Sequence, residues 1–228
     1  MNLINKVIWL FKFLHFIIIS FFYPGYVKYY EIDSVFKRNT PIRIYDLLRV
    51  NKGIVLDVGC GDGDTFCLLS PSVFPIGVEI SRIRTKRVRK HASVILADAQ
   101  ELPIRNGAID FVVASEILEH LPFPQKCLHE VYRVLKNRGK LGIIIPNDKV
   151  YTLYRLTNLK EIWKVIAYRY QHFWHFNIRN FMQFLDKYNV YFTVMRVYTE
   201  KRKWKCLKIL NRVDIFHWYI ITQKCAGD

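Results

Sequence analysis

Cysteine is scarce in this chain and follows no metal-binding spacing. Its five cysteines are scattered, odd in number and never arranged as Cys-x-x-Cys. This pattern excludes a disulfide framework and a cysteine zinc site, and it predicts reduced thiols in a reducing compartment. Internal repeats and low-complexity tracts are also absent. At 228 residues, the chain has room for one domain with a proper core.

Acidic residues are also few compared with basic ones. The chain has 19 Asp and Glu against 35 Lys and Arg, which gives a net charge of +16. Such a balance favours anionic partners, namely nucleic acid, an anionic membrane surface or phosphorylated substrates. Part of the charge is concentrated in two runs, residues 82–90 and 201–205. A basic run is also compatible with a solvated face, so charge alone does not choose the partner.

Long apolar runs are limited to residues 7–23, which Pro24 and Gly25 end. Seventeen residues are at the lower limit for a membrane span, and Lys12 and His15 interrupt them. No small-residue cleavage site follows, which argues against a removed signal peptide. We favour a helix lying in the membrane plane, because aromatic residues beside lysine suit the headgroup boundary. A true span, or a helix packed over the ligand cleft or in a dimer interface, remains an alternative.

This segment defines the predicted organisation. Residues 1–27 form an apolar N-terminal helix and residues 28–228 form the folded domain, with residues 148–180 as a lid over the substrate. The predicted location is cytoplasmic, peripheral to or anchored at the inner face of the membrane.

A glycine-rich turn at residues 55–63 is the most informative motif. An apolar strand ends in Asp57 and is followed by Gly59, Gly61 and Gly63 at every second position. Glycines this close after a strand predict a tight turn at which a ligand meets bare backbone. The dinucleotide pattern G-x-G-x-x-G does not fit, because its third small position falls on Asp64.

Further strands and helices alternate after this turn. The predicted strands are 75–81, 94–99, 109–115 and 140–146, and the predicted helices are 41–50 before the turn and 130–136 before the last strand. Glu79 and Asp98 lie near the ends of the first two of these strands. Glu79 is 22 residues after Asp57, where a Rossmann-like unit places its ribose-binding carboxylate. The alternation predicts an α/β fold with a mostly parallel sheet and helices on both faces.

The order of these motifs resembles class I S-adenosylmethionine-dependent methyltransferases of the type 11 branch, over residues 42–147. The resemblance implies S-adenosylmethionine as cofactor and a seven-stranded Rossmann-like sheet. The pattern after residue 146 fits its closing antiparallel hairpin: a helix 178–188 capped by Asn177, a strand 190–198, a short helix 204–212 and a strand 216–222. The implied cofactor-binding residues are Asp57, Gly59, Cys60, Gly61, Gly63, Glu79, Ile80, Asp98, Ala99, Ser115 and Glu116.

No covalent nucleophile is evident. The chain has neither a Pro-Cys pair, as used for C5 methylation of pyrimidines, nor an Asp/Asn-Pro-Pro-Tyr/Phe motif, as used on exocyclic amines. The catalytic residue is therefore open, with His120, His172 and His175 as candidates. Of these, His172 and His175 are the candidates for a general base.

Glu116, Glu119 and His120 allow two interpretations, since on a helix they would share one face. The favoured one involves no metal: Glu116 lines the cofactor pocket, Glu119 is a surface residue and His120 caps or packs. In the alternative, the three hold a divalent ion. That arrangement resembles the methyltransferases that cap small-RNA 3′ ends at the 2′-hydroxyl, in which a later histidine completes the site.

These observations predict methyl transfer to a small, quinone-like or lipid-like acceptor at an anionic membrane surface. The alternatives are a metal-assisted RNA 2′-O-methyltransferase and a non-catalytic relative that only binds the cofactor. No DNA-binding motif is present.

Overall fold

The computed structural model describes residues 44–45, 48–63, 66, 69–89, 92–147, 172–190, 194–200 and 214–224. Several predicted segments lie outside these residues: the N-terminal helix, residues 148–171 of the lid, and the helix 204–212. Among the residues that are described, no helix has the length and apolar character needed to cross a bilayer.

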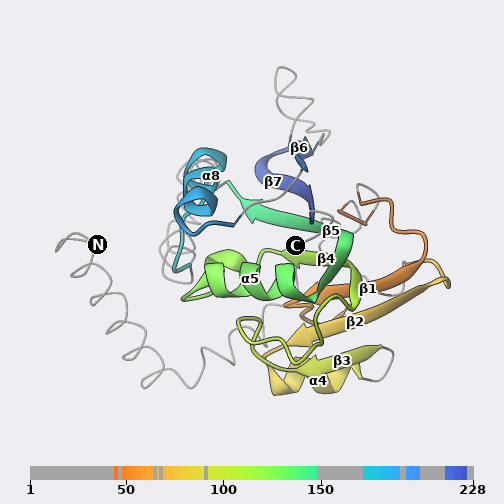
Figure 1. The fold of residues 1–228 in the computed structure, drawn as a ribbon. Helices are drawn as coiled ribbons and strands as arrows, with labels where there is room; N and C mark the ends of the chain where they lie inside the picture. Colours follow the sequence, from red (N-terminus) through yellow and green to blue (C-terminus); the bar gives the residue numbers. More distant parts are fainter. Residues whose placement is uncertain are drawn as a thin grey trace, which may run out of the picture.

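The core of the molecule is one mixed sheet in the order β3-β2-β1-β4-β5-β7-β6 (Figure 1). Its strands are β1 (Gly53–Val58), β2 (Val73–Glu79), β3 (Ser93–Leu96), β4 (Ile109–Ser115), β5 (Leu135–Pro146), β6 (Val194–Glu200) and β7 (Asp214–Gln223). The first five strands in sequence are parallel, whereas β7 is antiparallel to both β5 and β6. The mostly parallel, Rossmann-like sheet confirms the predicted fold class.

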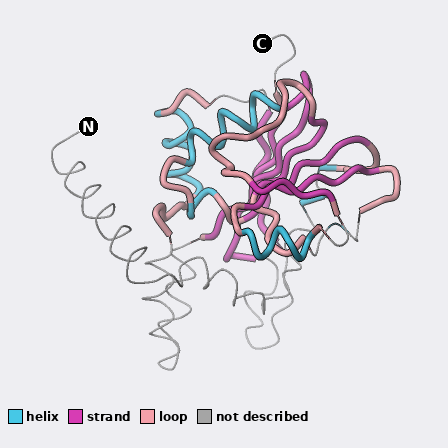
Figure 2. The backbone as a smooth tube through the Cα atoms, turned by 90° about the horizontal axis from the view of Figure 1, so that it is seen from below, coloured by secondary structure: helices cyan, strands magenta, loops and turns pink. Residues whose placement is uncertain are grey.

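Helices cover both faces of this sheet (Figure 2). Successive side chains of a strand point to opposite faces, so each face contributes buried apolar residues to its own cluster. Val112 packs in a cluster with Leu128 of α5 (Pro124–Val134) and with the buried face of α8 (Ile178–Lys187). The next residue, Val113, belongs to the cluster on the opposite face with Ile44. Apolar residues on both sides of a strand are typical of a parallel sheet buried between helices.

Two element boundaries differ from the prediction for identifiable reasons. The predicted helix 130–136 ends earlier, since Leu135 is already extended and begins β5. The predicted strand 94–99 ends at Leu96, because the Asp98 carboxylate accepts a hydrogen bond from the Gln100 N–H at 2.8 Å and closes a turn. The helix predicted from Asn177 is confirmed as α8, where Asn177 and Asn180 cap each other reciprocally.

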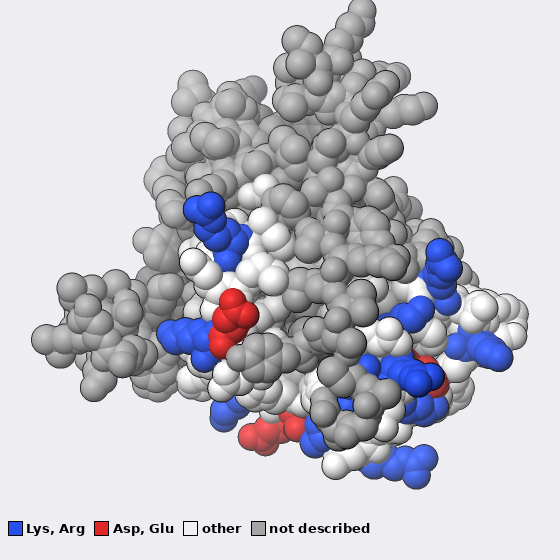
Figure 3. All heavy atoms as spheres, turned by 45° about the horizontal axis from the view of Figure 1, so that its top comes forward, with Lys and Arg blue, Asp and Glu red and all other residues white. Residues whose placement is uncertain are grey.

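The surface of the described part is basic, as the composition requires. Figure 3 shows one face on which Lys and Arg side chains are more widespread than Asp and Glu. One source is α4 (Arg82–Val88), which Ser81 caps at the N-terminus and Arg89 follows. Arg82, Lys86, Arg87 and Arg89 are all exposed, so this helix presents a positive surface to solvent.

Candidate functional site

The carboxyl ends of the parallel strands carry the predicted cofactor-binding residues. In the sheet, β1 lies between β2 and β4, so the connections from β1 and from β3 run in opposite directions. A crevice for ligands forms at such a switch point, outside the strand ends. Asp57, Glu79 and Ser115 lie at the carboxyl ends of β1, β2 and β4, and Asp98 follows β3.

The glycine turn after β1 adopts a backbone that other residues rarely take. Gly59, Gly61 and Gly63 have φ values of +72°, +59° and +70°. The Gly59 N–H donates to the Val78 carbonyl at 2.8 Å, which fastens the turn to β2. The Ile117 side chain fills the space beside the Gly59 Cα, so that a β-carbon at Gly59 would collide with it. The turn and the segment after β4 are thus packed together.

Glu79 connects the glycine turn to the start of α4. Its Oε2 accepts from the Gly61 N–H at 2.9 Å, and its Oε1 accepts from the Ser81 N–H at 2.8 Å. The side chain is only 7% exposed, and burial raises the pKa of this carboxyl above its ordinary value against the lowering effect of those N–H groups and Arg84. Each carboxylate oxygen has a second lone pair, so the same group can accept hydrogen bonds from ribose hydroxyls.

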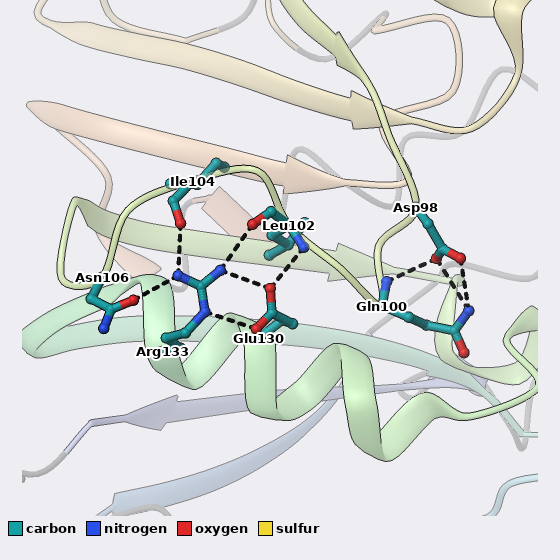
Figure 4. Close-up of polar contacts among 7 residues, drawn as sticks. All are labelled: Asp98, Gln100, Leu102, Ile104, Asn106, Glu130 and Arg133. Carbon is teal, nitrogen blue, oxygen red and sulfur yellow. Dashed lines mark hydrogen bonds and ion pairs between the residues drawn. The ribbon is translucent and has the colours of Figure 1, made fainter.

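Asp98 is oriented by Gln100, a residue that the sequence did not single out (Figure 4). The Gln100 Nε2 group donates to both carboxylate oxygens at 3.1 Å, and its Oε1 accepts from the Phe123 N–H. The loop beyond is fixed to α5 by Arg133, which donates to the carbonyls of Leu102 and Ile104 at 2.9 and 2.7 Å. The position of Asp98 is therefore set by α5 as well as by β3.

Apolar side chains are exposed next to these acids. Ile80 follows Glu79 and is 71% exposed, and Leu96 precedes Asp98 by two residues and is 42% exposed. Glu79 and Leu96 are register partners across β2 and β3. A pair of exposed apolar groups beside two hydrogen-bonding carboxylates suits a flat ring with polar edges. Leu96 was not among the predicted site residues, because on sequence alone it is an ordinary strand residue. The predicted Ala99 is buried.

Asp57 and Cys60 are both held by contacts within the fold. Asp57 is 5% exposed and accepts a hydrogen bond from the Tyr45 hydroxyl at 3.1 Å. Cys60 packs its sulfur against Gly77. Burial, with Asp57 and Glu79 nearby, raises the pKa of the Cys60 thiol far above its usual range. A thiol held in its neutral form is a poor nucleophile.

The segment after β4 is not the continuous helix that would place Glu116, Glu119 and His120 on one face. Glu116 has a φ of +50° and its N–H donates to the Ile144 carbonyl, so it belongs to a turn. Only the short helix η2 (Leu118–His120) follows, and Glu116 therefore does not share a helical face with Glu119 and His120. The expectation that Glu119 is a surface residue is also wrong, since it is 1% exposed.

Two of the three candidate histidines come together with Glu119. One ligand atom from each of Glu119, His120 and His172 lies within 4.8 Å of the others, and Glu116 is not part of this group. The His120 and His172 ring centroids are 4.6 Å apart, and those of His172 and His175 are 6.1 Å apart. The general base among these histidines stays a prediction, as does the role of each predicted cofactor residue.

Comparison with known proteins agrees with this geometry. Residues 56–143 match a family model described as a methyltransferase domain. The chain is 28% identical over 167 residues to the chloroplastic 2-methyl-6-phytyl-1,4-hydroquinone methyltransferase of Spinacia oleracea, covering 70% of this chain and 46% of that one. It is 31% identical over 128 residues to the demethylmenaquinone methyltransferase of Lactobacillus johnsonii, covering 50% and 52%.

Among solved structures, a SAM-dependent methyltransferase from Archaeoglobus fulgidus superposes with a TM-score of 0.60 at 19% identity, covering 81% of this chain and 91% of that one, which supports the fold. The chain spans about half the length of the curated relatives it matches. The glycine turn, the strand-ending acids, the sheet order and the matched domain lead to one conclusion. Residues 56–143 are a methyltransferase domain of the type 11 family, and the fold of the described residues is that of S-adenosylmethionine-dependent methyltransferases.

Proposed function

We propose that this protein transfers the methyl group of S-adenosylmethionine to a small, quinone-like or lipid-like acceptor at a membrane surface. The observation that carries the proposal is the placement of Asp57, Glu79 and Asp98 around one glycine turn at the switch point of the sheet. These strand ends offer the groups that the cofactor needs: backbone N–H donors, the carboxylate acceptors of Glu79 and Asp98, and the exposed apolar side chain of Ile80.

The acceptor class is inferred from the relatives. Two of them, from Spinacia oleracea and Lactobacillus johnsonii, are named for methylating a phytyl hydroquinone and demethylmenaquinone. Both compounds are rings with long apolar tails, which partition into membranes. Since bound S-adenosylmethionine brings its own activated methyl group, the protein's task is to align the acceptor behind that group and to exclude water.

The test is transfer of labelled methyl from S-adenosylmethionine. The full chain is incubated with demethylmenaquinol in vesicles and, separately, with whole-cell extract that is then split into lipid, RNA and protein fractions. We expect label in the quinol and in the lipid fraction. Label confined to RNA would overturn the acceptor, and cofactor binding without transfer to any fraction would favour the non-catalytic relative.

The membrane part of the proposal is supported by the basic surface of α4. Arg82, Lys86 and Arg89 are exposed, and exposed Ile83 lies among them. Near an anionic bilayer each basic residue contributes about 1 kcal/mol of attraction. An apolar side chain within such a cluster can enter the headgroup region.

Reversing three of these charges is expected to weaken vesicle binding. The variant Arg82→Glu/Lys86→Glu/Arg89→Glu should bind phosphatidylserine vesicles about 100-fold more weakly, since three attractive contributions of about 1 kcal/mol are lost. Cosedimentation at several salt concentrations measures this. A matched control, Arg105→Glu/Arg138→Glu/Lys187→Glu, changes the net charge equally at exposed positions on other elements. Equal losses in both variants would contradict a docking role for α4.

A ribose 2′-hydroxyl of RNA is the second candidate acceptor, because Glu119, His120 and His172 converge near the cofactor turn. It predicts that labelling of RNA depends on a divalent ion and that RNA binding weakens steeply as salt rises. The extract experiment distinguishes the two candidates when it is run with and without a chelator.

A further inference from the structure

The hydrogen bonds of Gln100 leave the Asp98 carboxylate with one acceptor site for a ligand (Figure 4). The Gln100 backbone N–H donates to Oδ1 at 2.8 Å, and its side-chain Nε2 group donates to Oδ1 and Oδ2 at 3.1 Å each. A carboxylate offers about four lone-pair sites, two on each oxygen. Within the described part of the chain, Oδ1 thus accepts two hydrogen bonds and Oδ2 accepts one. Since Asp98 is only half-buried, the remaining site on Oδ2 is within reach of a ligand.

The direction of the Gln100 amide is fixed from its other side. Its Oε1 accepts a hydrogen bond from the Phe123 N–H at 3.1 Å. Because a backbone N–H can only donate, the amide oxygen must face Phe123 and the amide nitrogen must face Asp98. Turning the amide over would set two donors against each other at Phe123 and two acceptors against each other at Asp98. Gln100 therefore presents a donor to Asp98, and Asp98 is held as an acceptor.

Helix α5 anchors the chain on both sides of this contact. Phe123 directly precedes α5. Two residues after Gln100, the Leu102 N–H donates to Glu130 Oε2 at 2.7 Å, and the Leu102 carbonyl accepts from Arg133 at 2.9 Å. Glu130 and Arg133 are themselves joined by an ion pair at 2.7 Å. Gln100 thus lies between two points that are fastened to one helix, which holds the carboxylate beside it in one orientation.

A carboxylate with a fixed orientation can distinguish two related purines. Adenine carries an amino donor at position 6 next to an acceptor, ring nitrogen N1. Hypoxanthine carries an oxo acceptor at position 6 next to a donor, N1–H. A fixed carboxylate that accepts from the 6-amino group opposes the 6-oxo group, whereas a carboxylate free to turn can accept from N1–H instead. Selectivity for adenine therefore needs a held carboxylate, and its charge alone is not enough.

We propose that Gln100 is a positioning residue that makes the site selective for a 6-amino purine, because it holds Asp98 with Oδ2 as the acceptor toward the base. The inference rests on the proposed function, since it takes the adenosine part of S-adenosylmethionine as the ligand of Asp98. It goes beyond that function, since it assigns the choice between two bases to a side chain that acts through another. The exposed Ile80 and Leu96 beside the acids give such a base its apolar surroundings.

The first test compares two ligands that differ at the purine. The full chain is titrated calorimetrically with S-adenosylhomocysteine and with S-inosylhomocysteine, so that no methyl transfer is needed. We expect at least about 100-fold tighter binding of S-adenosylhomocysteine, since a site that accepts a hydrogen bond from a ligand N–H strongly rejects an analogue without it. Equal affinities would overturn this inference and leave the cofactor in place. Binding of neither ligand would overturn the proposed function, and this inference with it.

Gln100→Met tests the positioning residue, because it removes the amide and nearly keeps the length of the side chain. Binding of S-adenosylhomocysteine should weaken about tenfold while binding of S-inosylhomocysteine does not, so the preference should fall to about tenfold or less. Gln223→Met is the matched control: the Gln223 amide donates to the Arg138 carbonyl at 2.8 Å, and β7 is remote from β3 in the sheet. An unchanged preference in Gln100→Met would overturn the role of Gln100.

Asp98→Asn gives a readout that a loss of folding cannot produce. The two Gln100 donors should hold the new amide oxygen at the place of Oδ1, so that the new amide N–H takes the place of Oδ2. This group donates to a 6-oxo group, and the preference should reverse to S-inosylhomocysteine by about tenfold. In Asp98→Asn/Gln100→Met the reversal should disappear. A reversal of the same size in the double variant would show that Gln100 does not set the orientation, and it would overturn the proposal.

Discussion

Replacing Glu79 with alanine is expected to weaken binding of S-adenosylmethionine by at least about a hundredfold. The carboxylate accepts hydrogen bonds from the Gly61 and Ser81 N–H groups, and it is the group positioned for the ribose hydroxyls. A hydrogen bond to a charged group contributes about 1.5–3 kcal/mol, and two lost bonds exceed the 2.7 kcal/mol that corresponds to about a hundredfold change. Calorimetric titration with the cofactor measures the effect.

Glu101→Ala is the control for this variant. Glu101 lies in the loop after β3 and is exposed. Its substitution by alanine removes the same negative charge as Glu79→Ala. Its cofactor affinity should stay within about threefold of the unchanged protein. If Glu79→Ala unfolds at the same temperature as the original chain and still binds the cofactor normally, the assignment of Glu79 is wrong.

The pH dependence of the same site follows from the raised pKa of Glu79. Burial is its largest cause, and the folded-state pKa lies above the ordinary 4.5. Between 4.5 and the folded pKa the native state holds more protons than the unfolded state, so this group's contribution to the free energy of unfolding decreases as pH rises through that window. Cofactor binding has the opposite trend, because the ribose contact needs the ionised acceptor. Affinity should therefore fall as pH is lowered through the folded pKa, and Glu79→Ala should remove that part of the dependence.

Much of the fold could be read from the sequence because it depends on local patterns. The turn after β1 needs glycines whatever surrounds it, and acids at strand ends recur at a spacing set by one strand, one helix and the next strand. Asn177 caps α8 through atoms within three residues of it. The parallel arrangement follows from the alternation of strands and helices. Such features are decided within short stretches of chain.

The parts that could not be predicted depend on contacts between distant residues. Gln100 orients Asp98 through a turn that also reaches Phe123, and nothing in the sequence nearby indicates this. Glu119 follows a turn at Glu116, whose positive φ is not predicted by any residue pattern. The segment of Trp174 packs against Glu119, so Glu119 does not lie at the surface. The meeting of His172 with η2 likewise depends on how the aromatic residues before α8 pack.

The second large effect is expected from Gly59→Ala. At φ +72° a β-carbon brings about 1–2 kcal/mol of backbone strain, and this one would also collide with the Ile117 side chain. Overpacking of a fitted contact adds about 1–3 kcal/mol. The turn must move to relieve the collision, which separates the Gly61 N–H from Glu79. We expect a loss of about 2–5 kcal/mol in the free energy of unfolding and no measurable methyl transfer.

Gly107→Ala separates strain from collision. Gly107 has a φ of +59°, but a β-carbon there would meet no atom within 4 Å. It should lose about 1–2 kcal/mol by strain alone and bind S-adenosylmethionine normally. Adding Ile117→Ala to Gly59→Ala removes the colliding atoms, so the double variant should recover much of the cofactor affinity while retaining the strain. Should the double variant bind no better than Gly59→Ala, contact with Ile117 is not what requires glycine at position 59, and the requirement must come from the backbone conformation or from the ligand itself.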